Sequence, residues 1–69
     1  MIIALNGRRE ELPDGASVAD AVTKAGVEDS AGRGVAVAVD GEVIRRVDWG
    51  RTKLVRDQTV EVVRAVQGG

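Results

Sequence analysis

The 69-residue chain contains no cysteine and no histidine, and Trp49 is its only aromatic residue. Without cysteine it can form neither a disulfide nor a thiolate metal site, and without histidine it lacks the usual metal ligand and proton carrier of neutral pH. Its hydrophobic residues are almost all Val, Ala, Ile and Leu. The core must therefore be aliphatic and thin, and any chemistry must depend on other groups.

The sequence also lacks an excess of one charge and a long apolar run. The formal net charge is −1 with both signs interspersed, which excludes the basic field that nucleic-acid binding needs. No stretch approaches the roughly 20 apolar residues of a membrane-spanning helix, and no signal peptide is evident. We therefore expect a cytoplasmic protein with neither a nucleic acid nor a membrane as partner. A chain this short buries only about 60% of its unfolded surface, so a deep enzyme cleft is not expected.

The first residues have the pattern of a β-hairpin. Residues 2–5 are aliphatic, and Asn6-Gly7 follows them, a pair that tolerates positive φ and strongly favours a two-residue turn. Residues 8–12 then form a polar return strand, which ends at the turn signal Pro13-Asp14-Gly15.

A helix is predicted next. Ser17 is a good N-cap residue, and Asp20, three positions later, completes an approximate capping box. From Val18 onward, apolar residues recur at helical spacing until Gly26, which ends the helix. Residues 27–34 show no clear period and are predicted to be a loop.

The second half predicts three more strands. Residues 35–39 and 42–47 flank the turn pair Asp40-Gly41, and residues 59–66 form a run dominated by β-branched residues. Residues 48–57 form a connection with at most one short turn or strand. The order ββαβββ predicts an α+β, β-grasp (ubiquitin-like) fold, a mixed sheet of four to five strands with one main helix on one face.

The end of the chain projects from this domain. Residues 1–66 form the domain, and the tail Gln67, Gly68 and Gly69 follows the last strand directly. Three extended residues reach at most about 10 Å, and glycine has no Cβ, so this tail can enter a narrow channel. We expect the Gly69 carboxylate to reach another protein's active site. The alternative is a frayed end without function.

The sequence resembles the ThiS family over nearly its whole length. The similarity includes the Asn6-Gly7 turn and the helix entry at Ser17-Val18. It also includes residues 34–44, Arg46 and Trp49 after the fourth strand, and residues 60–69 with the final glycine pair.

The resemblance implies a sulfur carrier of thiamine biosynthesis with no catalysis of its own. A ThiF-like adenylyltransferase would use ATP and magnesium to join the Gly69 carboxylate to AMP, and sulfur from a donor protein would then displace AMP. The thiocarboxylate would pass its sulfur to a ThiG-like thiazole synthase. Gly69 would carry the modification, Gly68 and Gln67 would give the tail access, and no cofactor would be bound.

Partner docking is assigned to the exposed sheet face and to individual residues near it. Val66 and Gln67 would set the direction in which the tail leaves the domain. Arg46 and Trp49 are further docking candidates. A solvated side chain for Arg46 and a core anchor for Trp49 are the alternatives.

Other functions with the same fold remain open. These are a sulfur carrier for molybdopterin or cysteine synthesis, a ubiquitin-like protein modifier, and an interaction module whose glycine tail is idle. An enzyme using Glu10 and Glu11, or Asp48 and Asp57, is disfavoured because adjacent strand residues point to opposite faces.

Overall fold

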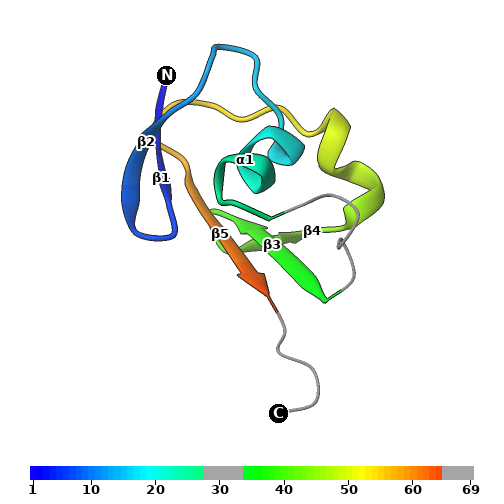
Figure 1. Cartoon of the computed structure of the whole chain (residues 1–69). Coiled ribbons are helices and arrows are strands. Elements are labelled where there is room, and N and C mark those ends of the chain that lie inside the picture. The colour runs from blue at the N-terminus through cyan, green and yellow to red at the C-terminus, as the bar shows by residue number, and fades with distance from the viewer. Residues whose placement is uncertain (28–33, 65–69) are drawn as a thin grey trace.

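The computed structural model describes residues 1–27 and 34–64, and these form one mixed sheet covered by one helix (Figure 1). The strand order is β2-β1-β5-β3-β4. The β1 and β5 strands pair in parallel, whereas the other neighbours are antiparallel. The elements are β1 (Ile2–Leu5), β2 (Arg8–Glu11), α1 (Val18–Lys24), β3 (Val35–Val39), β4 (Glu42–Ile44), the 3-10 helix η2 (Arg46–Arg51) and β5 (Thr59–Arg64). The predicted α+β class and the predicted order of strands and helix are confirmed.

The core lies between α1 and one face of the sheet. Strand side chains alternate between the two faces, and the inward positions of β1, β3 and β5 are aliphatic. The helix adds an apolar stripe at helical spacing. The largest fully buried side chains are those of Ile3, Val18, Val37 and Val60. Because the helix covers one face, the opposite sheet face has no helix over it among residues 1–27 and 34–64.

The two hairpin turns fasten their strands to β5. Asn6 and Asp40 both have positive φ, 51° and 49°, and each precedes a glycine with positive φ, as two-residue hairpin turns require. The Asn6 Oδ1 accepts a hydrogen bond from the Val62 amide at 2.8 Å. The Asp40 Oδ1 accepts one from the Thr59 amide at 2.9 Å. Each turn therefore closes its own hairpin and also holds the neighbouring central strand.

The helix begins at Val18, as predicted, because its N-terminus carries a complete capping box. The Ser17 amide donates to Asp20 Oδ2 at 2.8 Å, and the Asp20 amide donates to Ser17 Oγ at 3.3 Å. The Ser17 amide thereby gains a side-chain acceptor, and the Asp20 amide, which also donates to the Ser17 carbonyl at 3.0 Å, gains a second one. At the other end Ala25 is the C-cap and Gly26 follows with φ 88°.

The fourth strand is shorter than predicted. It ends at Ile44 rather than at residue 47, and the chain turns at Arg45 into η2. The Trp49 indole causes this change, because it is buried and its Nε1 donates to the Ile44 carbonyl at 3.0 Å. Burial of one large side chain thus outweighs the β propensity of the short segment that precedes it. The connection predicted over 48–57 contains the rest of this 3-10 turn.

Two other boundaries are only partly described. The predicted strand 59–66 is present from Thr59 to Arg64, and residues 65–66 lie outside the described part. Most of the predicted loop 27–34 also lies outside it. Among residues 1–27 and 34–64, no helix has the length and apolarity to cross a membrane.

Two valines of β5 test this arrangement. Val60 is 0% exposed, whereas Val63 on the opposite face is 59% exposed. We expect Val60→Ala to lower the free energy of unfolding by about 2 kcal/mol, because two buried methyl groups are lost and a cavity remains. The matched control Val63→Ala should change it by less than about 0.5 kcal/mol. Denaturant unfolding followed by Trp49 fluorescence measures both, and equal losses would contradict the assigned faces.

Candidate functional site

The tail residues predicted to carry the chemistry lie outside the described part of the chain. These are Gln67, Gly68 and Gly69, with Val66 at their base. Their roles therefore stay predictions. What the structure describes is the strand that leads to them, which ends at Arg64 at one end of the sheet (Figure 1).

The β5 strand, which precedes the tail, is held on both sides by neighbouring strands. It lies in the middle of the sheet, between β1 and β3. Val60 and Val62 are buried in the core, and the Asn6 and Asp40 side chains bind its backbone. Five residues separate Arg64 from the end of the sequence, a reach of about 17 Å when extended. A sulfur atom carried by Gly69 would therefore stay within about 17 Å of Arg64.

Beside β5 the open sheet face carries an apolar patch. Val63 pairs with Ala36, and Ala38 pairs with both Val43 and Glu61, so these side chains share the face that α1 does not cover. Val43 is 70% exposed and Val63 is 59% exposed. We call Ala36, Ala38, Val43 and Val63 the open-face patch. Alternation alone did not select these residues, because they became neighbours only once the strand register was known.

Trp49 lies in the core rather than on that face. Its side chain is 5% exposed, and its indole nitrogen donates to a backbone carbonyl. The interpretation of Trp49 as an anchor for the connection agrees with this position. A direct docking role for Trp49 stays a prediction.

Arg46 opens η2 and has an exposed side chain. The acidic residue of this helix, Asp48, is held by its neighbours: it accepts a hydrogen bond from Arg51 Nε at 2.7 Å, and Arg45 Nε lies 3.6 Å from its other oxygen. The Arg51 hydrogen bond and the two positive charges keep the pKa of the Asp48 carboxyl below its usual range. The Asp48 side chain therefore stays ionised near neutral pH, which makes it a poor candidate for a general acid. A docking role for Arg46 stays a prediction.

The adjacent acidic residues Glu10 and Glu11 do not form a catalytic pair. Glu10 pairs with Ile3 and Glu11 pairs with Ile2, so the two carboxylates leave opposite faces of β2. No group of three or more potential metal ligands occurs among residues 1–27 and 34–64.

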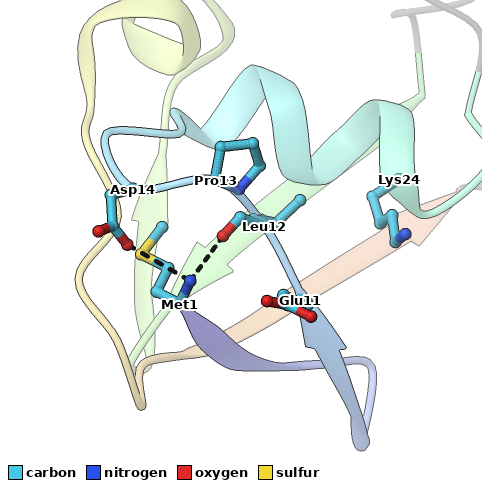
Figure 2. Close-up of a pocket in the computed structure, with 6 residues that line it drawn as sticks. All are labelled: Met1, Glu11, Leu12, Pro13, Asp14 and Lys24. Atoms are coloured by element: carbon cyan, nitrogen blue, oxygen red, sulfur yellow. Dashed lines mark hydrogen bonds and ion pairs between the residues drawn. The ribbon is translucent and has the colours of Figure 1, made fainter.

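A shallow hollow of about 600 Å³ lies between the end of β2 and α1 (Figure 2). In it the Met1 amino group donates to the Leu12 carbonyl at 2.7 Å and lies 3.4 Å from Asp14 Oδ1. Glu11 and Lys24 also line the hollow. It contains no residue of the predicted site, and the interactions drawn in it join the Met1 amino group to Leu12 and Asp14.

Comparison with known proteins agrees with the fold. The model of the ThiS family matches residues 2–69. A crystal structure of the thiamine biosynthesis protein ThiS from Geobacter metallireducens superposes with a TM-score of 0.78 at 22% identity, and the alignment covers 100% of both chains. No curated protein matches the sequence. Since the family match includes every strand, the helix and the final glycine pair, the chain belongs to the ThiS family.

Proposed function

We propose that the chain is a sulfur carrier of thiamine biosynthesis that works in the cytoplasm through the carboxylate of Gly69. The observation that carries this proposal is the family match, which extends through Gly68 and Gly69 at the end of the sequence. The fold supports it, because β5 is a rigid central strand that leads directly to this tail. In this role the protein is a substrate of its partners and needs no active site of its own.

The proposed chemistry needs activation of the carboxylate. A terminal carboxyl group has a pKa of about 3.3 to 3.7, so it is ionised at neutral pH and is a poor electrophile. In the first step a ThiF-like adenylyltransferase, using magnesium, joins a Gly69 oxygen to the α-phosphorus of ATP and releases pyrophosphate. In the second step hydrosulfide, released by a donor protein, attacks the carbonyl carbon through its sulfur, AMP leaves with the electrons of the broken C–O bond, and the sulfur loses its proton to solvent. The resulting thiocarboxylate then supplies sulfur to a ThiG-like thiazole synthase.

Within this proposal the open-face patch is where the partners dock. A small sheet with one helix leaves apolar side chains exposed on its other face, and such clusters commonly mark protein interfaces. The patch lies on β3, β4 and β5, and Val63 is six residues before Gly69. A partner that holds the tail is therefore close enough to cover the patch as well.

Removal of the two final glycines tests the carrier function. We expect the wild-type chain, incubated with the adenylyltransferase, ATP, magnesium and sulfide, to gain the mass of sulfur in place of oxygen. A variant lacking Gly68 and Gly69 should gain none, because its last residue cannot reach the active site. Intact-mass spectrometry measures both.

The same assay separates the carrier from an idle-tail interaction module. Unfolding of the variant, followed by Trp49 fluorescence, serves as the control for folding. An interaction module predicts no adduct on the wild-type chain with a competent enzyme, and that result would overturn the proposal. Transfer of the sulfur to thiazole synthase then distinguishes thiamine synthesis from molybdopterin or cysteine synthesis.

Charge placed on the open-face patch tests the docking surface. We expect Val43→Glu and Val63→Glu each to raise the KM for adenylation about tenfold, because a carboxylate would be buried against an apolar partner surface. The matched control is Val55→Glu, since Val55 is 61% exposed but lies on no strand. Steady-state pyrophosphate release measures all three. An equal effect of the control would show that added charge, rather than the patch, is responsible.

A further inference from the structure

The β5 strand has an edge that its neighbours cover only in part. It pairs with β3 from Val60 to Arg64, but with β1 only at Thr59 and Val60. The β1 strand ends at Leu5, where the chain turns back into β2 (Figure 1). Among the described residues, the β1 side of β5 therefore has no neighbouring strand beyond Val60.

The hydrogen bonds identify which backbone groups face that open side. Ala4 and Asn6 donate to the carbonyls of Gln58 and Val60, each at 2.9 Å, so even-numbered β5 residues face β1. The Asp40 amide donates to the Thr59 carbonyl at 2.7 Å, so odd-numbered residues face β3. Since this direction alternates along a strand, the backbone groups of Val62 and Arg64 point to the open side.

Asn6 covers the first of these groups. Its Oδ1 accepts from the Val62 amide at 2.8 Å, in the position that the next carbonyl of a longer β1 would occupy. The side chain thus ends the ladder between β1 and β5. The Val62 carbonyl and the Arg64 amide follow it and have no partner strand among the described residues. An acceptor and a donor at this spacing match the backbone of an extended chain.

The outer edges of the sheet are less suited to receive such a chain. The β2 edge consists of Arg8, Arg9, Glu10 and Glu11, and charged side chains protect edge strands from pairing. The β4 edge is three residues long. The open side of β5 is different because it lies beside the segment that leads to the tail.

We propose that an extended segment of the adenylating partner pairs with β5 at the Val62 carbonyl and the Arg64 amide and continues the sheet where β1 stops. This inference rests on the proposed function, because the five residues after Arg64 place the partner's active site within about 17 Å. The exposed side chains beside this edge are Val63 and Arg64. They fit a partner segment that places an apolar residue beside Val63 and an acidic residue beside Arg64.

A proline at position 64 tests the pairing. Arg64→Pro removes the amide that faces the open side but no bond to β3, and Val63 is already in the extended conformation that a following proline requires. Arg64→Ala is the matched control, because it removes the side chain and keeps the amide. We expect Arg64→Pro to raise the Kd for the adenylyltransferase about tenfold relative to Arg64→Ala, at an equal Tm. Isothermal titration calorimetry measures the affinities.

Amide hydrogen exchange on the wild-type chain gives a readout that needs no substitution. We expect the Arg64 amide to be protected when the adenylyltransferase binds, and to exchange rapidly in the free chain. Equal affinities of the two variants together with unchanged exchange would overturn the inference. Protection that appears in the free chain as its concentration rises would instead identify a second copy as the occupant and would also overturn it.

The proposed function fails separately. If the wild-type chain is adenylated but Arg64→Pro behaves like Arg64→Ala, only the strand pairing is wrong. If the wild-type chain is neither bound nor adenylated by a competent enzyme, the carrier function is wrong, and the strand pairing falls with it.

Discussion

The position of β5 between β1 and β3 is the constraint on which the rest of the structure depends. This strand buries Val60 and Val62 against the helix and joins the N-terminal hairpin to the second hairpin. Neither hairpin alone has enough partners to bury its apolar face, because an isolated pair of strands is marginally stable in water. The Asn6 and Asp40 side chains also accept hydrogen bonds from backbone amides of β5, in addition to the apolar packing of the core. The position of β5, the strand that precedes the tail in the sequence, is therefore set by the whole sheet.

Much of this fold was predictable because its local signals agree with its tertiary structure. The Asn6-Gly7 and Asp40-Gly41 turns, the Ser17 cap and the strand over residues 35–39 each occur where the sequence predicted them. The fourth strand was mispredicted because its end is decided by Trp49, whose burial depends on packing against distant elements. A window of neighbouring residues contains no information about such packing.

The tail of the candidate site was predictable from the sequence, but the open-face patch was not. The prediction that Gly68 and Gly69 carry the function comes from the sequence, and the family match includes both residues. The open-face patch could not be chosen from the sequence, because alternation gives two faces for every strand and does not say which one the helix covers. Its membership follows from register, which places Ala36 opposite Val63 and Ala38 opposite Val43. The second role of Asn6, on the backbone of a strand 56 positions away, also depends on tertiary structure.

The parallel pairing of β1 with β5 also has a consequence for how the protein is made. It joins residues 4–5 to residues 59–60, which are nearly the whole described chain apart. Contacts between such distant residues are slow to form, because the long intervening loop must close first. During synthesis the sheet cannot be completed until β5 has left the ribosome. A prematurely terminated chain without β5 would lack the central strand and would become a target for proteolysis. The molecules that fold correctly are therefore the ones that also contain the strand preceding the tail.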